Sequence, residues 1–304
     1  MRYRQLGGSG LTVSAVGLGG NNFGGRLDLA KTRAVVEAAL DAGITLLDTA
    51  NTYGNRGGSE TLLGEVLKGR RDQVVLATKF GSDMGEGSGV ARASRWYIRR
   101  AVEESLRRLQ TDRIDLYQLH RPDGVTPIGE TLGALDELVR EGKVLYVGSS
   151  QLPAWQVADA EWTARSTGTS RFVSAQNHYS LLVRDAESEL LPACRSLGVG
   201  VLPFFPLANG LLTGKYRRGA PRPAGTRMEG RDIPDDTYDR LEALEGLAKE
   251  RGRSLLELAV SGLLAHEPVA SVIAGATTPD QVRANAAAGE WELDAGDVAA
   301  LDEL

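Results

Sequence analysis

The chain has 304 residues, of which 42% are hydrophobic and 25% charged, the composition of a globular protein and not of a disordered one. Its net charge of −5 argues against binding of nucleic acid through many phosphate contacts, because such proteins are strongly basic. With Cys194 as the one cysteine and no H-E-x-x-H spacing, we expect no disulfide and no metal. Neither a signal segment nor a membrane-length apolar run is found, so we expect a cytoplasmic protein without a membrane partner.

Short apolar segments alternate along the chain with segments of helical period. First, Tyr3–Leu6 and Thr12–Val13 flank a Gly-Gly-Ser-Gly turn and predict a β-hairpin. Eight strands are predicted after it, and from the second to the seventh their ends recur at intervals of about one βαβ unit, roughly 30 residues or more. The predicted strands are Ala15–Gly19, Thr45–Ala50, Val74–Phe80, Ile114–His120, Val144–Ser150, Phe172–Tyr179, Val199–Leu207 and Ser271–Gly275.

The segments between these strands carry helix signals. In Ser94–Gln110 the apolar residues form one stripe of helical spacing. Thr126-Pro127 and Thr278-Pro279 each predict an N-cap followed by a proline at the first helical position. Glycines at 43, 69, 142 and 198 follow helical runs and predict their ends.

Strands that alternate with helices and are buried on both faces fit a closed barrel or a doubly wound sheet. The even spacing and the eightfold count favour the barrel, with the hairpin at its bottom. No linker divides the chain, so we expect residues 1–304 to form one (β/α)8 TIM barrel domain. Active sites of such barrels lie at the carboxyl ends of the strands. Two long predicted loops, Gly81–Ala93 and Ala208–Pro234, follow the third and seventh strands at that end.

Four chemically distinct side chains are predicted at this same end. Asp48, Lys79 and His120 each follow apolar strand residues, and Tyr53 comes five residues after Asp48. One such residue could simply end a strand, but an acid, a base, a phenol and an imidazole together indicate catalysis. A buried charge needs a partner, which pairs Asp48 with Lys79. A lysine ammonium beside a phenol favours the phenolate, which makes Tyr53 suited to give a proton to a carbonyl oxygen.

The motifs around these residues resemble those of the aldo-keto reductase superfamily. They are Asp48-Thr-Ala-Asn-Thr-Tyr53-Gly, Leu76-Ala-Thr-Lys79-Phe, Leu116-Tyr-Gln-Leu-His120-Arg-Pro-Asp and Gly142-Lys-Val-Leu-Tyr-Val-Gly-Ser-Ser150. The resemblance runs from about residue 1 to 290, in order, and is nearest to bacterial members related to potassium-channel β subunits. It implies a (β/α)8 barrel, an NADPH cofactor and reduction of a small aldehyde or ketone. Tyr53 would be the general acid, Lys79 and Asp48 would tune it, and His120 would orient the carbonyl.

The resemblance also implies a cofactor site that differs from a Rossmann fold. The sequence Gly17-Leu-Gly19-Gly is only a partial dinucleotide fingerprint, and no Tyr-x-x-x-Lys of a short-chain dehydrogenase occurs. By resemblance, the nicotinamide carboxamide is held by Ser150, Gln151 and Gln176, and the nicotinamide ring stacks on Phe204. The resemblance further implies a pyrophosphate strap formed by Phe205, Pro206, Leu207, Asn209 and Lys215. By the same resemblance, the adenosine phosphate would lie at Gly275, Thr277, Gln281 and Asn285, where a predicted helix N-terminus would offer free N–H groups. We also expect Gly20, Asn21 and Asp48 to contact the cofactor.

Several positions depart from the family pattern. Gln151 stands where Asn or Arg is usual, Phe205 where Ser is usual and Ala284 where Glu is usual, and Gly275–Thr278 holds no basic residue. We expect Arg227 to substitute for the missing cation, and NADH remains a possible cofactor.

Two alternative functions stay open. One is a redox-sensing regulatory subunit that binds NADPH with little turnover, although His120 beside an intact Tyr53 argues against it. The other is a Schiff-base lyase with Lys79 as nucleophile. The sequence indicates neither the physiological substrate nor the oligomeric state.

Overall fold

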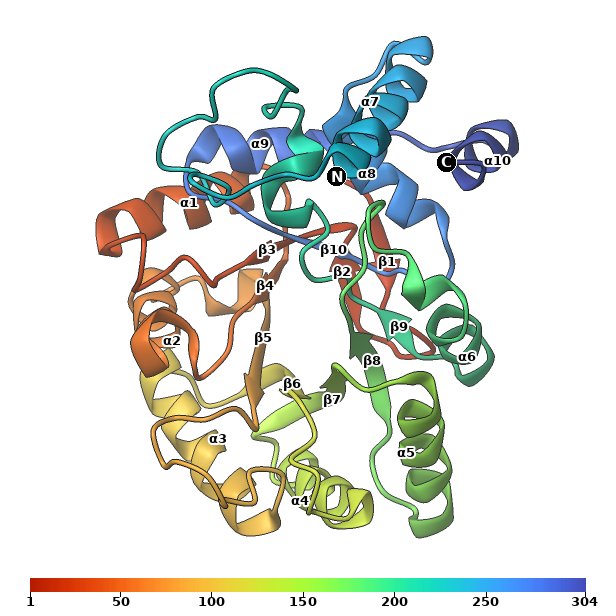
Figure 1. The fold of residues 1–304 in the computed structure, drawn as a ribbon. Coiled ribbons are helices and arrows are strands. Elements are labelled where there is room, and N and C mark those ends of the chain that lie inside the picture. Colours follow the sequence, from red (N-terminus) through yellow and green to blue (C-terminus); the bar gives the residue numbers. More distant parts are fainter.

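The computed structural model describes residues 1–304 and has at its centre a ring of eight parallel strands surrounded by helices (Figure 1). Neighbouring strands pair in the order β10-β3-β4-β5-β6-β7-β8-β9. Two backbone hydrogen bonds join the ends of this series, from Val201 N to Pro268 O at 2.9 Å and from Ala270 N to Val201 O at 3.0 Å. The ring is therefore closed, and the barrel prediction is confirmed over the doubly wound sheet. The strands are β3 (Val16–Gly19), β4 (Leu46–Asp48), β5 (Val75–Phe80), β6 (Ile114–Leu119), β7 (Val144–Ser150), β8 (Phe172–Gln176), β9 (Gly200–Val201) and β10 (Val272–Gly275).

Ten α-helices are present, most of them packed around the barrel. Several begin at a residue whose side chain accepts a hydrogen bond from a backbone N–H of the first turn. Thr278 accepts a hydrogen bond from the backbone N–H of Gln281, which confirms it as an N-cap. The prediction for Thr126 is wrong, because Pro127 is the N-cap there and the Thr126 hydroxyl donates to Asp123 at 2.7 Å. The helices are α1 (Leu29–Asp41), α2 (Tyr53–Val66), α3 (Arg95–Leu109), α4 (Ile128–Arg140), α5 (Ala154–Thr167), α6 (Leu190–Leu197), α7 (Asp235–Glu250), α8 (Leu255–Ala265), α9 (Pro279–Ala288) and α10 (Ala295–Asp302).

The predicted N-terminal hairpin is present and formed by β1 (Tyr3–Gln5) and β2 (Thr12–Ser14). Leu6, which follows β1, and Val13, in the middle of β2, are fully buried and pack into a small cluster of barrel residues. This inner cluster fills the lower half of the barrel and comprises Leu6, Val13, Leu46, Ala77, Leu116, Leu202, Ala270 and Ile273. The hairpin therefore closes the amino-terminal end of the barrel and leaves the other end for the site.

Strand periodicity then determines what lies above the inner cluster. Side chains two positions apart on a strand point to the same face. The residues two positions beyond the inner-cluster members of β4, β5 and β6 therefore also point inward, one layer higher. These residues are Asp48, Lys79 and Gln118.

The predicted strand Val199–Leu207 is much shorter in the structure, where β9 ends at Val201. Pro203 and Pro206 lack the N–H that a sheet requires, and Phe205 has a positive φ of 53°. The chain therefore leaves the sheet early, and this lets Phe204 and Phe205 face the open end of the barrel, where both line the main cavity.

No helix of the structure combines the length and the apolar character that crossing a membrane requires.

Candidate active site

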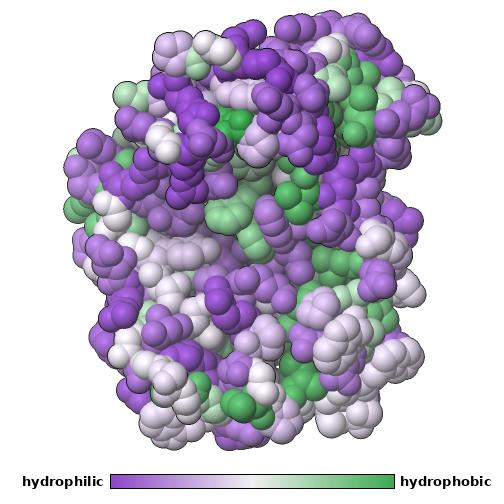
Figure 2. All heavy atoms as spheres, viewed as in Figure 1, coloured by the Kyte–Doolittle hydropathy of each residue, from purple (hydrophilic) through white to green (hydrophobic).

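A cavity of about 1300 Å³ opens at the carboxyl ends of the barrel strands. Its walls include parts of the loops between β5 and α3 and between β9 and α7, the two long loops that the sequence predicted at this end. Only 11 of its 41 lining residues are hydrophobic, and Figure 2 shows a hollow on this face with many hydrophilic residues around it. The cavity is therefore large enough for a ligand with many polar groups.

At the floor of this cavity Asp48 and Lys79 form a buried ion pair. Lys79 Nζ donates to Asp48 Oδ2 at 2.6 Å and to the backbone oxygen of Thr49 at 2.8 Å, and its side chain has no exposure to solvent. Burial alone would lower the pKa of Lys79, but the charge of Asp48 and the phenol of Tyr53 outweigh it, so the pKa is raised. Lys79 is thus held as an ammonium ion, which is unfavourable for a Schiff-base nucleophile because that role needs a neutral amine.

Tyr53 lies directly over this pair at the start of α2. Lys79 Nζ is 5.0 Å from the centre of the Tyr53 ring. The following residue, Gly54, has φ of 65°, and a Cβ there would lie 2.3 Å from the backbone oxygen of Phe23. Only glycine fits that position, so the backbone after Tyr53 is fixed by close packing against the loop that follows β3.

His120 lies across from Tyr53 and follows β6. The two rings meet edge to face with centres 5.9 Å apart. Burial, with the positive charges of Lys79 and Arg121, lowers the pKa of His120 to about 3. The imidazole is therefore neutral at pH 7 and can donate a single N–H. The four residues that the sequence singled out are thus brought together at one point of the cavity.

Two glutamines complete the surroundings of Asp48. Gln118 Nε2 donates to Asp48 Oδ1 at 3.1 Å, and Gln176 Nε2 donates to the same oxygen at 2.9 Å. Gln118 was missed by the sequence analysis, although a polar residue within the apolar segment Ile114–Leu119 was a usable signal. Both amides stabilise the Asp48 carboxylate, and Gln176 keeps its amide oxygen free to accept a further hydrogen bond.

Nearly all of the predicted cofactor residues line this cavity. Gly20 does not: a Cβ on it would meet Ser59 and Phe23, so it faces the packed interior while Gly19 lines the cavity. Lys79, predicted as a catalytic residue, is fully buried beside Asp48 and does not itself line the cavity. The predicted residues on the wall are Asn21, Asp48, Ser150, Gln151, Gln176, Phe204, Phe205, Pro206, Leu207, Asn209, Lys215, Arg227, Gly275, Thr277, Gln281 and Asn285.

Two cations that line the cavity, Arg227 of the loop between β9 and α7 and Arg26 of the loop after β3, link these two loops. Arg227 donates to the side-chain oxygens of Asn21 and Asn22, at 3.2 and 3.3 Å, and Arg26 donates to the backbone oxygen of Gly225 at 2.9 Å. The loop between β9 and α7 is thereby tied to the loop after β3. Partial burial and the charge of Arg26 lower the pKa of Arg227.

The residues present fit a dinucleotide. Arg26, Lys215 and Arg227 line the cavity and have no carboxylate within 4.0 Å, which is the environment that phosphate groups need. Phe204 offers an aromatic face and is backed by His178, whose ring lies nearly parallel to it with centres 5.4 Å apart. The N-terminus of α9, whose helix dipole favours anions, lies beside Thr277 and Gln281 on the cavity wall.

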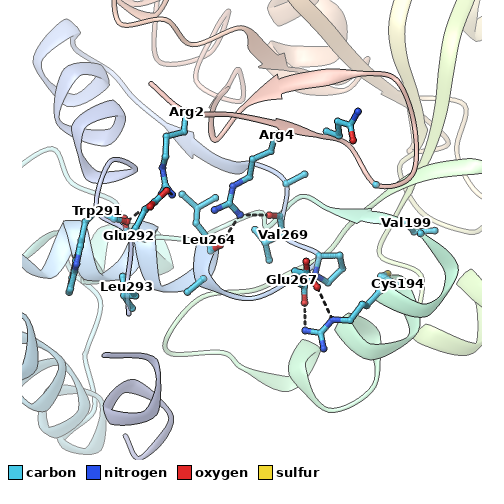
Figure 3. Close-up of a pocket in the computed structure, with 18 residues that line it drawn as sticks. Arg2, Arg4, Cys194, Val199, Leu264, Glu267, Val269, Trp291, Glu292 and Leu293 are labelled. Carbon is cyan, nitrogen blue, oxygen red and sulfur yellow. Dashed lines mark hydrogen bonds and ion pairs between the residues drawn. The ribbon is translucent and has the colours of Figure 1, made fainter. Parts of the chain in front are cut away.

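A second, shallower cavity of about 690 Å³ lies beside the N-terminal hairpin (Figure 3). Its charged groups are largely satisfied locally. Arg2 pairs with Glu292 at 2.6 Å, and Arg195 lies 3.6 Å from Glu267. Arg4 donates to the backbone oxygens of Leu264 and Val269. None of the four catalytic candidates lines it, so the site belongs at the other end of the barrel.

Comparison with known proteins agrees with this geometry. The model of the aldo/keto reductase family matches residues 15–304. An uncharacterized oxidoreductase of Bacillus subtilis, YrpG, is 41% identical over 97% of this chain and 93% of its own. A probable voltage-gated potassium channel subunit beta of Oryza sativa is 35% identical over 94% of this chain and 90% of its own. The L-glyceraldehyde 3-phosphate reductase of Escherichia coli K12 is 36% identical over 94% of this chain and 86% of its own. With its barrel, its cavity and these relatives, the chain belongs to the aldo/keto reductase family and is an oxidoreductase of that family.

Proposed function

We propose that the protein reduces aldehydes or ketones to alcohols with NADPH and that Tyr53 gives the proton to the carbonyl oxygen. The observation that carries this proposal is the convergence of Tyr53, His120 and the buried Asp48–Lys79 pair at one point of a cavity whose lining also includes cations without a carboxylate partner. A proton donor and an electropositive dinucleotide channel are the two parts that carbonyl reduction requires.

The cofactor supplies a hydride when it is bound. On the protein side, Gln176 would accept a hydrogen bond from the carboxamide through its free amide oxygen, and Phe204 would stack on the ring. Lys215, Arg227 and Arg26 would neutralise the phosphates. Arg227 lies against Asn21 and Asn22, and Asn22 donates to the backbone oxygen of Ala276. This places a cation near Gly275–Thr278, which favours NADPH over NADH.

Proton transfer is assigned to the Tyr53 hydroxyl. The Lys79 ammonium, fixed by Asp48 and Thr49, stabilises negative charge that develops on the phenol oxygen as the proton leaves. Neutral His120 donates an N–H to the substrate oxygen and holds it near the phenol. The two glutamines keep the Asp48 carboxylate in place beneath this group.

The test is consumption of NADPH and of NADH with a panel of aldehydes and ketones, with the alcohol product identified by mass spectrometry. We expect many turnovers per protein molecule and a preference for NADPH. Oxidation of only one equivalent of bound NADPH would instead support the regulatory-subunit alternative. A Lys79 adduct trapped by borohydride would support the lyase and contradict the proposal.

A further inference from the structure

We propose that the carbonyl substrate carries an anionic group, a carboxylate or a phosphate, and that Arg121 binds it. This inference rests on the proposed function and specifies the substrate class of the same site. It is carried by the arrangement of charged residues at the end of the cavity where Tyr53 and His120 lie.

Arg121 is the charged residue at this end that has no partner. It follows His120 directly, lines the cavity and is exposed. Its guanidinium makes no hydrogen bond to the protein and has no carboxylate within 4.0 Å. It lies near enough to the His120 imidazole for its charge to lower the pKa of that group. A guanidinium so placed can reach a substrate whose carbonyl is held at His120.

The acidic side chains at this end do not compete for Arg121. Asp123 accepts hydrogen bonds from the backbone N–H of Ala93 at 2.8 Å and from the N–H and hydroxyl of Thr126 at 2.8 and 2.7 Å. Asp83 accepts from the N–H of Gly85 at 3.0 Å and pairs with Arg92 at 2.8 Å. Each carboxylate is therefore satisfied within the loops themselves.

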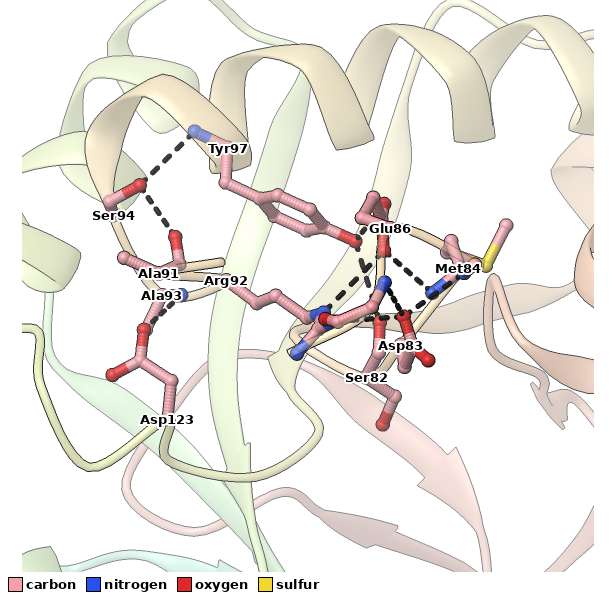
Figure 4. A network of polar contacts seen from close by, with 12 residues as sticks. Ser82, Asp83, Met84, Glu86, Ala91, Arg92, Ala93, Ser94, Tyr97 and Asp123 are labelled. Carbon is pink, nitrogen blue, oxygen red and sulfur yellow. Dashed lines mark hydrogen bonds and ion pairs between the residues drawn. The ribbon is translucent and has the colours of Figure 1, made fainter. Parts of the chain in front are cut away.

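Figure 4 shows how the loop between β5 and α3 binds its own charges. Arg92 lies between Asp83 and Glu86, and Glu86 also accepts a hydrogen bond from the Tyr97 hydroxyl at 3.2 Å. Because Arg92 faces two carboxylates, it is not available to a substrate. The charged residues of the two loops that line this end are Asp83, Arg92, Arg121 and Asp123. Of the two cations among them, only Arg121 has all its hydrogen-bond donors unused.

The two loops that line this end offer a substrate several polar groups. Ser82, Asp83, Gln151 and Asp123 are polar, and Val90 and Val125 are the aliphatic side chains of the two loops. The cations Arg26, Lys215 and Arg227 lie on the parts of the cavity assigned to the cofactor, so they do not serve the substrate. A short carbonyl compound with one anionic group fits both the polarity and the position of Arg121.

The test compares pairs of substrates that share a carbonyl but differ in charge. One pair is 4-oxobutanoate and its methyl ester, and the other is glyceraldehyde 3-phosphate and glyceraldehyde. The measured quantity is the ratio of kcat/KM for the charged member to kcat/KM for the neutral one. It is measured in the wild type, Arg121→Met and Arg121→Lys, with Arg107→Met on the outer face of α3 as the control for loss of a positive charge.

We expect the wild type to prefer the charged member of at least one pair. A preference in the first pair identifies the group as a carboxylate, and a preference in the second identifies it as a phosphate. Arg121→Met should lower the ratio about tenfold to a hundredfold, as expected for one charge-assisted hydrogen bond, mainly through KM. Arg121→Lys should restore part of it, and Arg107→Met should leave it unchanged. An unchanged ratio in Arg121→Met, or no preference in the wild type while the neutral substrates are reduced, overturns the inference alone. If no substrate of either pair or of the wider panel is reduced, the proposed function fails as well.

Discussion

Replacement of Lys79 by methionine tests how much the buried Asp48–Lys79 ion pair contributes to the stability of the folded protein. The Lys79 side chain is fully buried, and its ammonium donates to Asp48 and to the backbone oxygen of Thr49. Methionine fills similar space but leaves the Asp48 carboxylate buried without a counter-charge. Removal of one partner of a buried pair costs about 3–5 kcal/mol. Because Gln118 and Gln176 still donate to Asp48, we expect a value near the lower end, about 3 kcal/mol.

The assay is urea unfolding at pH 7, followed by circular dichroism. Lys68→Met is the matched control, because Lys68 is 58% exposed and pairs only with Glu65 at the surface, so its unfolding midpoint should match that of the wild type. The double variant Asp48→Asn/Lys79→Met no longer buries an unpaired charge and should be more stable than Lys79→Met. The reasoning is refuted if Lys79→Met unfolds at the same urea concentration as Lys68→Met, or if the two substitutions are additive.

Three further predictions follow from the site. His120 has a pKa of about 3 in the folded protein and about 6.5 when unfolded, so the unfolded state binds the proton first and stability is lost as pH falls through this window. Between pH 7 and pH 4, the free energy of unfolding of His120→Asn should therefore fall by about 3 kcal/mol less than that of the wild type. Gln118→Leu removes one of two amide donors to Asp48 and should lower kcat about tenfold, with little effect on the KM of the cofactor. Thr277→Arg adds a guanidinium to Gly275–Thr278, which itself has no basic residue, and should tighten NADPH binding selectively over NADH binding.

Each of these has a result that contradicts it. Equal acid sensitivity of the wild type and His120→Asn would mean that the imidazole accepts a proton in the folded protein. Wild-type kcat in Gln118→Leu would mean that the second amide alone suffices. If Thr277→Arg tightened NADH as much as NADPH in a fluorescence titration, this segment would not face the 2′-phosphate.

The barrel and the convergence of Asp48, Lys79 and His120 were predictable because both rest on short-range patterns in the sequence. The apolar stripe predicted in Ser94–Gln110 is confirmed, with Ile98, Ala101, Val102, Leu106 and Leu109 all buried. Asp48, Lys79 and His120 follow strands whose carboxyl ends must meet in a barrel, so their convergence needed only the fold. Pairing in register then aligns Lys79 with Gln118 and Ser150 with Gln176.

Other features depend on contacts that no local pattern encodes. Although large aromatic side chains are usually well buried, Trp96, Trp155 and Trp162 are 63%, 66% and 61% exposed, because they fall outside the buried stripes of α3 and α5. Trp291 does pack against the core. The hydrogen bond from Arg227 to Asn21 joins residues 206 positions apart and fixes the long loop across the cavity. The sequence suggested a role for Arg227 but not this contact.

The central claim is that Tyr53 protonates the substrate carbonyl, and a single-turnover measurement of Tyr53→Phe tests it most directly. Protein saturated with NADPH is mixed with a reactive aldehyde, and cofactor oxidation is followed by stopped flow. A general acid contributes about 10²–10⁴ in rate, so the variant should be at least about a hundredfold slower, while its Kd for NADPH, measured by fluorescence quenching, stays close to that of the wild type. Oxidation at more than about a tenth of the wild-type rate, with NADPH bound equally well, would contradict the account and make His120 the first candidate for the acid.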